Sequence, residues 1–295
     1  VDSSFVFLKK LINDSHEFSF EYASDLIYAT IQSRISLLDH NFPFNYDNPS
    51  FKFYSCLSSY IQHFKDQSVH IIRELLDWIS FCDENILPKV IKCLNTSLEV
   101  GAIPSDLLPT MYHDLLKRLN DDSELMNYIL GCLVNLLTLF PGICDPNELL
   151  ARMDEMWDPK DEDMIMILLP IYMDIWANID VPINNERYMT FITYMKSEQF
   201  RYWNFRLNLR YLMTIVDHRQ DLDLDDSFKA AEVLAHFLLK SDEYKEEMEF
   251  DEEFIEEMKE SLKTCCQKDE KIPANLLNLY YRFPKLKNEL AQIIS

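Results

Sequence analysis

Glycine is almost absent from this chain, with only 3 residues among 295. An average protein contains about 7% glycine, because tight hairpins, phosphate-binding loops and many connections in α/β folds need backbone with positive φ. The scarcity leaves the α-helix as the natural element. Leu, Met, Glu, Lys and Ala fill the long segments, and the alternation of Val, Ile and Thr that is typical of strands is nearly missing. The sequence therefore predicts an all-α fold.

A repeated unit of roughly 40 residues is visible along the chain: an apolar-periodic helix, a short polar turn and a longer helix. The clearest copy runs from Gly101 to Leu139. Similar polar turns follow at 158–161, 196–198 and 240–243. Upstream the interval widens, which an insertion loop at 41–50, marked by two prolines, explains. We expect about six units in a single helical-repeat domain over residues 1–295, and the missing initiator Met suggests a fragment of a longer chain.

One copy of this unit resembles the armadillo-repeat signature. Gly101-Ala102-Ile103-Pro104 leads into Leu-Leu helices and an Asp-containing turn, and Asn135 follows near the end of the last helix; Asn178 looks like the same Asn one unit later. The resemblance implies a right-handed α-solenoid of about six armadillo/HEAT-like repeats, in which stacked neighbours bury the faces that one helix pair cannot. It also implies a concave groove where Asn135 and Asn178 hydrogen-bond the main chain of an extended ligand.

Two further residues join the predicted peptide-binding set, Asp174 and Trp176. In importin alpha, a tryptophan one helical turn before the Asn forms slots for basic side chains. The corresponding positions here are Gly131 and Asp174, so the tryptophan array is absent. For Trp176, as for the other tryptophans, we favour an anchor in the core or between repeats over a ligand-binding platform. The two asparagines are equally suited to helix caps or to polar groups satisfied locally.

Acidic residues outnumber basic ones by 50 to 28, and the net charge is −22. Such a charge repels nucleic acid and anionic membrane and attracts a basic partner, although the acids also simply solvate outer helix faces. The densest run lies between Asp242 and Glu260. Like charges at this density destabilise a helix, so we predict either a solvated face or a docking patch for a Lys/Arg-rich tail. The predicted patch comprises Glu246, Glu247, Glu249, Asp251, Glu252, Glu253, Glu256 and Glu257.

The seven cysteines are odd in number, scattered and mostly set in apolar runs, which is typical of reduced thiols in a cytoplasmic or nuclear protein. No apolar stretch reaches the length of about 18 residues that a membrane span needs.

Motifs of enzymes are missing from the sequence. It contains no glycine-rich phosphate loop and no Gly-x-Ser-x-Gly elbow, and its histidines are dispersed. We therefore expect no catalytic residue, cofactor or metal, although an active site assembled across the fold is an alternative. The leading expectation is a scaffold or adaptor that holds a protein or peptide, possibly basic, in a helical groove. A divergent nuclear transport receptor for Lys/Arg-rich signals and a regulatory subunit of an enzyme complex are the alternatives.

Overall fold

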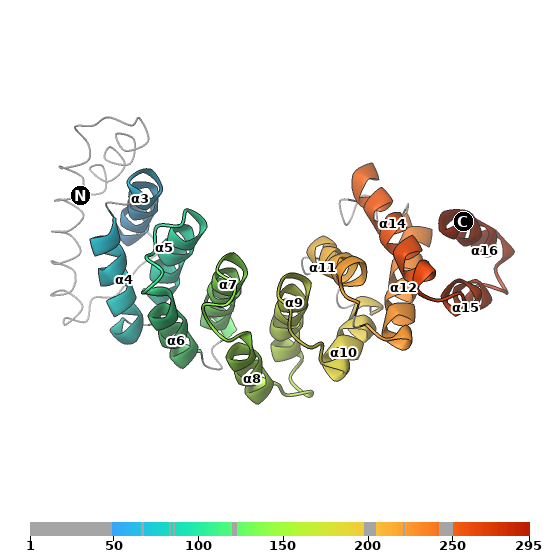
Figure 1. Ribbon diagram of the computed structural model, residues 1–295, viewed down its shortest axis with the longest axis horizontal. Coiled ribbons are helices and arrows are strands. Elements are labelled where there is room, and N and C mark those ends of the chain that lie inside the picture. Colours follow the sequence, from blue (N-terminus) through green and yellow to red (C-terminus); the bar gives the residue numbers. More distant parts are fainter. Residues whose placement is uncertain are drawn as a thin grey trace. The chain divides into compact units, whose positions relative to one another are not determined.

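The computed structural model describes residues 49–295, apart from 66–67, 83, 85, 120–122, 198–204, 221 and 242–249. All thirteen elements in these residues are α-helices, so the prediction of an all-α fold is confirmed for them. The chain divides into two compact units, Val1–Lys160 and Asp161–Ser295, here called the first and the second unit (Figure 1). The expectation of a single domain over residues 1–295 stays a prediction.

The helices of the first unit pack in two rows. In one row α3 packs against α5 and α5 against α7; in the other α4 packs against α6, and α4 and α6 also contact α5 and α7, respectively. From α3 to α7, each helix thus packs against the helix two places further along the chain or is packed against by the helix two places before it. The helices are α3 (Pro49–His63), α4 (Val69–Phe81), α5 (Leu87–Glu99), α6 (Leu108–Arg118), α7 (Ser123–Leu139) and α8 (Pro146–Met156).

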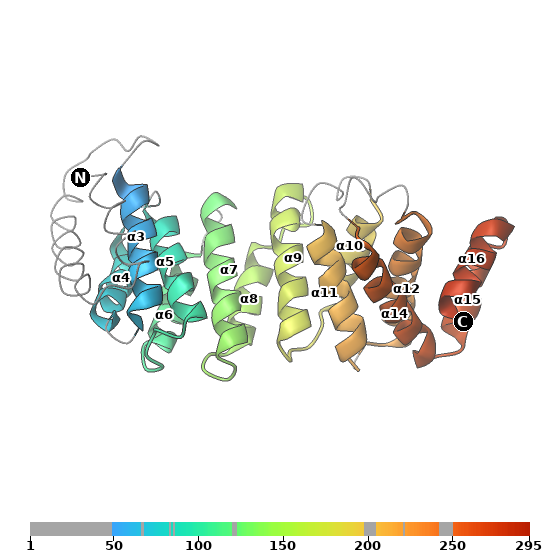
Figure 2. The ribbon, with the colours of Figure 1, turned by 90° about the horizontal axis from the view of Figure 1, so that it is seen from above.

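The second unit follows the same rule. One row runs from α9 through α11 and α14 to α16, and the other from α10 through α12 to α15. Figure 2 shows α11 beside α14, and the two helices pack against each other. The helices are α9 (Glu162–Asn178), α10 (Asn185–Met195), α11 (Phe205–His218), α12 (Leu224–Leu239), α14 (Glu252–Lys268), α15 (Lys271–Leu279) and α16 (Pro284–Ile294).

Short polar side chains begin many of these helices. At five N-termini the side chain of the residue before the helix accepts a hydrogen bond from a free backbone N–H of the first turn, as expected for an N-cap. These residues are Asp145, Asp161, Asn184, Asp223 and Asp251.

The predicted insertion loop at 41–50 overlaps the start of a helix, because α3 begins at Pro49. Proline is favoured at the first helical position, where its missing N–H is not needed. Residues 41–48 lie outside the described residues.

At two of the three glycines the backbone has a positive φ, a conformation that glycine adopts much more readily than other residues. Gly101 has φ of 63° and Gly142 has φ of 83°, in the region that favours glycine. At Gly101 the chain forms a Schellman motif that ends α5: the Gly101 N–H donates to the Leu98 carbonyl at 2.9 Å, and the Ala102 N–H donates to Ser97 at 2.8 Å. The third glycine, Gly131, lies inside α7.

Hydrogen bonds from side chains to main-chain carbonyls connect several helices to one that lies about one predicted repeat further along the chain. In the first unit, Arg118 donates to the Cys82 carbonyl and Arg152 to the Leu119 carbonyl, each at 3.0 Å and across 36 and 33 positions, respectively. The Tyr112 hydroxyl donates to the Asp145 carbonyl, 33 positions away.

In the second unit Arg219 has a similar role. It follows α11 and donates to the carbonyls of Val181 at 2.6 Å, Ile179 at 3.2 Å and Trp176 at 3.5 Å, up to 43 positions away. These carbonyls lie in the last turn of α9 and just after it, where helix carbonyls lack intrahelical donors. Arg219 thus satisfies the C-terminus of α9 from the next helix of the same row.

No helix in the described part of the chain is both long and apolar enough to cross a membrane.

Candidate protein-binding faces

An exposed face of α7 carries Tyr128, Gly131, Asn135 and Leu139. These residues are three or four positions apart, so they follow one side of the helix. The side chains of Tyr128 and Leu139 are each 46% exposed, and Asn135 is half-buried. The opposite side of α7 holds Met126, Leu130 and Leu133 in the core of the first unit. The four residues therefore face away from that core, and we call them the α7 face.

Asn135 is hydrogen-bonded to the neighbouring helix of its row. Its Nδ2 donates to the Oδ1 of Asn95 on α5 at 2.9 Å, across 40 positions, and the Nδ2 of Asn95 donates to the Oε1 of Glu99 at 3.2 Å. This chain of donors orients both amides. It leaves the Asn135 Oδ1 and one of its N–H groups without a partner among the described residues. Asn135 thus offers one acceptor and one donor at a half-buried position.

Asn178 makes its hydrogen bonds within its own helix. Its Nδ2 donates to the main-chain oxygen of Asp174 at 3.0 Å and to the Oδ1 of Asp174 at 2.7 Å. Asp174 also accepts a hydrogen bond from the Tyr211 hydroxyl on α11. Burial raises the pKa of Asp174 even though these two hydrogen bonds act in the opposite direction. Of the predicted peptide-binding residues, the structure thus brings Asn178 and Asp174 into contact, and Tyr211 joins them through its hydrogen bond to Asp174.

Trp176 lies in the core of the second unit, where it is 1% exposed. Its ring centroid is 5.4 Å from that of Tyr172 and 6.5 Å from that of Tyr188. A ligand on the surface of α9 would not reach this ring, so the structure favours the core-anchor interpretation over a ligand-binding role for Trp176.

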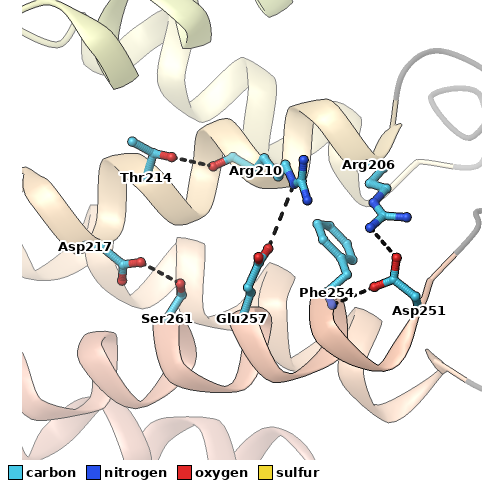
Figure 3. Close-up of polar contacts among 8 residues, drawn as sticks. All are labelled: Arg206, Arg210, Thr214, Asp217, Asp251, Phe254, Glu257 and Ser261. Carbon is cyan, nitrogen blue, oxygen red and sulfur yellow. Dashed lines mark hydrogen bonds and ion pairs between the residues drawn. The ribbon is translucent and has the colours of Figure 1, made fainter.

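The start of α14 is held against α11 by ion pairs (Figure 3). The Nη2 of Arg206 lies 2.5 Å from the Oδ2 of Asp251, and the Nε of Arg210 lies 3.9 Å from the Oε2 of Glu257. The two guanidinium carbons lie 4.8 and 5.7 Å from the ring centroid of buried Phe254, within the range of cation–π attraction. The two arginines therefore engage both the carboxylates and the aromatic ring of α14.

Asp251 has a second role as the N-cap of α14. Its Oδ1 accepts from the Phe254 N–H at 2.8 Å. This backbone hydrogen bond and the nearby Arg206 lower the pKa of Asp251. In the last turn of α11, Asp217 accepts a hydrogen bond from the Ser261 hydroxyl at 2.8 Å. Polar contacts with α11 thus extend along α14 from Asp251 to Ser261.

The predicted acidic patch is therefore only partly available to a partner. Glu246, Glu247 and Glu249 lie outside the described residues. Asp251 and Glu257 face the arginines of α11, and Glu256 pairs with Lys259 at 2.6 Å. The exposed carboxylates Glu252 and Glu253 lie in the first turn of α14, where a negative charge is favourable. A docking role for this patch stays a prediction.

Sequence reasoning missed four residues that these faces contain: Asn95, Arg206, Arg210 and Tyr211. A usable signal existed for Asn95, which precedes Asn135 by the predicted repeat length. The two arginines also had a signal, because they are four positions apart and share one side of a helix in a strongly acidic chain. Tyr211 carried none.

Among the described residues, no group of three or more His, Cys, Asp or Glu side chains is placed to hold a metal ion. Comparisons of the chain with protein-family models, with curated proteins and with solved structures found no match.

Proposed function

We propose that this protein is a non-catalytic scaffold or adaptor, built as an α-solenoid of armadillo/HEAT-like repeats, that holds a segment of a partner protein on exposed helix faces. The packing of α3 on α5, α5 on α7 and α4 on α6, and the two rows of the second unit, support the solenoid in each unit. Hydrogen bonds that join successive helices of one row, between residues 33 to 43 positions apart, agree with a repeat of that length. A stack of this kind binds partners along the surface of one row of helices.

The observation that carries the proposal is the open amide of Asn135. Asn135 uses one N–H to reach Asn95 and keeps one donor and one acceptor for a ligand. A peptide main chain carries the same two groups, so Asn135 can bind it whatever its side chains are.

The charge of the chain adds a preference. A net charge of −22 gives a negative potential that accelerates the approach of basic partners. Exposed carboxylates such as Glu252 and Glu253 contribute to it. The proposed partner is thus a protein with basic regions, part of which binds in extended form.

Affinity purification with quantitative mass spectrometry tests the proposal. The tagged chain is compared with the double variant Asn135→Ala/Asn178→Ala and with the matched control Asn275→Ala, which removes an exposed asparagine on α15. We expect a defined set of proteins that the wild type and the control retain and the double variant loses. Recovery of the same proteins with all three would refute the role of the asparagine amides.

A further inference from the structure

A group of large apolar side chains is exposed where α15 joins α16, the last two helices labelled in Figure 1. Leu279, Tyr281 and Phe283 lie within five residues, and they are three of the seven large apolar side chains that are exposed in the described part of the chain. Tyr281 and Phe283 are each 59% exposed, more than the other five. Single exposed apolar residues are common, whereas a group of them is typical of a binding surface. We call residues 279–287 the α15–α16 turn.

Phe283 stands at a position where folding favours another kind of residue. It is the N-cap of α16, and its side chain makes no capping hydrogen bond. A short polar side chain is strongly preferred there, and five other helices of this chain have one. Burial does not compensate, because the ring is exposed. The stability of α16 therefore does not account for an aromatic residue at this position.

The same turn is basic. Between Lys271 and Asn288 the sequence has four basic residues and no acidic one, although acids outnumber bases by 50 to 28 in the whole chain. Among the described residues, no ion pair is found for three of these four, Arg282, Lys285 and Lys287. Four other cations of the second unit form ion pairs of 2.5 to 3.0 Å with carboxylates: Lys196, Arg206, Lys259 and Lys263. The charges of the α15–α16 turn thus stay open to an anionic partner.

The neighbouring helices α12 and α14 do not cancel this positive charge. Glu232 of α12 acts on the turn, since together with burial, the larger cause, it raises the pKa of Tyr280. Glu232 is itself paired with Lys196 at 2.5 Å. On α14, residues 261–268 include two lysines and no acid, and three of the five glutamates before them pair with cations. Glu289 is the one acidic residue of α16.

We propose that the α15–α16 turn binds an acidic segment of a partner protein that also carries apolar side chains. Apolar side chains of the segment would cover Leu279, Tyr281 and Phe283. Its carboxylates would pair with Arg282 and Lys285. The Arg282 Nε donates to the Tyr281 hydroxyl, and its guanidinium carbon lies 5.2 Å from the ring centroid. These contacts orient the guanidinium group, whose planar set of donors suits a carboxylate.

A short segment suits this surface better than a large polyanion does. Charges are screened over about 8 Å at physiological ionic strength, so a short segment responds mainly to the cations of the turn. A membrane or a nucleic acid duplex extends over several such lengths and would also meet the negative potential of a chain with a net charge of −22. The inference is independent of the proposed function, which concerns other helix faces and basic partners.

A random peptide library provides the probe. Peptides of about ten residues are selected on the whole wild-type chain, depleted on the double variant Tyr281→Ser/Phe283→Ser, synthesised with a fluorophore and titrated. This variant is expected to fold, because both rings are exposed and serine is favoured at an N-cap; circular dichroism and thermal unfolding will check it. The charge variant is Arg282→Gln/Lys285→Gln.

Each variant has a matched control. Leu207→Ser/Leu224→Ser removes two apolar side chains that are exposed elsewhere in the second unit. Lys92→Gln/Lys160→Gln removes two positive charges at exposed positions of the first unit, so that the net charge changes by the same amount as in the charge variant.

We expect acidic peptides with apolar residues. Their affinity should fall at least tenfold with Tyr281→Ser/Phe283→Ser, about threefold to tenfold with the charge variant, and less than twofold with either control. Raising the salt concentration from about 0.05 to 0.5 M should weaken binding at least threefold, since screening acts on charge pairs.

Several results would overturn the inference. These are selected peptides that are basic or neutral, equal affinity for the wild type and the charge variant at low salt, and the absence of any peptide that distinguishes the wild type from the depletion variant. Self-association of the chain that the depletion variant loses would instead make a second copy the occupant. Binding to vesicles of equal parts phosphatidylcholine and phosphatidylserine, lost in the same variant, would make a membrane the occupant. Peptides that bind both chains equally still test the proposed function, so the two can fail separately.

Discussion

Arg219 offers a test of how neighbouring helices of a row are joined. Replacing it with Met keeps most of the aliphatic side chain and removes every donor, so that the carbonyls of Ile179 and Val181 lose their partners. A hydrogen bond from a charged donor contributes about 1.5–3 kcal/mol when buried, and less at a partly exposed site. The third contact, to Trp176 at 3.5 Å, adds little. We expect Arg219→Met to destabilise the α9–α11 contact by about 2–3 kcal/mol.

Arg219→Lys provides an intermediate case. A lysine ammonium is shorter and has no planar fork, so it can reach about one of the carbonyls. We expect Arg219→Lys to recover about half of the loss. Arg118 provides the comparison in the first unit, because it donates to a single carbonyl, that of Cys82. Arg118→Met should cost about 1 kcal/mol.

Native-state hydrogen exchange followed by mass spectrometry measures these costs locally. Amides near the end of α9 should exchange faster in Arg219→Met than in the wild type, by a factor of about 30 to 150 if exchange is limited by opening. An effect below twofold would refute the assigned role of Arg219. So would a larger cost for Arg118→Met than for Arg219→Met, because the number of satisfied carbonyls would then not determine stability.

Three further predictions concern stability, each measured by urea unfolding. Gly131→Ala should stabilise the chain by about 0.5–1 kcal/mol, because it removes a helix-interior glycine without a clash, and destabilisation would show that the helix needs glycine there. Burial raises the pKa of Asp226 to about 6, so its ionisation destabilises the folded state as pH rises from about 4 to 7. Asp226→Asn should therefore gain stability relative to the wild type over this range, by about 1–2 kcal/mol after allowance for solvent screening. The control Asp225→Asn changes an exposed carboxylate and should gain clearly less stability. Equal gains for the two variants would contradict the effect of burial. Replacing both Asn95 and Asn135 with Ala should cost about 0.5–1 kcal/mol less than the sum of the single changes, and strict additivity would show that their hydrogen bond contributes nothing.

The sequence predicted the helical class and the start of α9 well. Scarce glycine excluded most alternatives, and the polar turn at 158–161 ends at Asp161, the N-cap of α9. Local signals of this kind act within a few residues, so they are visible in the sequence alone. The open amide of Asn135 also agrees with the position that the armadillo resemblance singles out, although its binding role is untested.

Burial on α9 was harder to predict. Apolar residues cover nearly the whole helix from Met164 to Trp176, so periodicity gives little indication of which side faces the core. Asp174 could be placed near Asn178 from their spacing of one helical turn. The core position of Trp176 could not be distinguished in this way.

The contacts between the arginines of α11 and the carboxylates of α14 could not be predicted from the sequence for another reason. Arg206 and Asp251 are 45 positions apart, and no local rule links them. Their contact depends on the packing of α11 against α14. Charge density alone therefore described the acidic run as a free patch, whereas part of it is neutralised within the second unit.

The order of helix contacts in the second unit has a consequence for how it comes apart. The helix pairs that pack there are close in chain order, from α9 with α10 and α11 to α15 with α16. Cooperativity in such an array reaches only from one neighbour to the next. Among these helices, α16 fully buries only Leu290, while α9 buries nine side chains. Fraying should therefore start at α16 and advance helix by helix, so the unit would yield under load in small increments and recover from them without complete refolding.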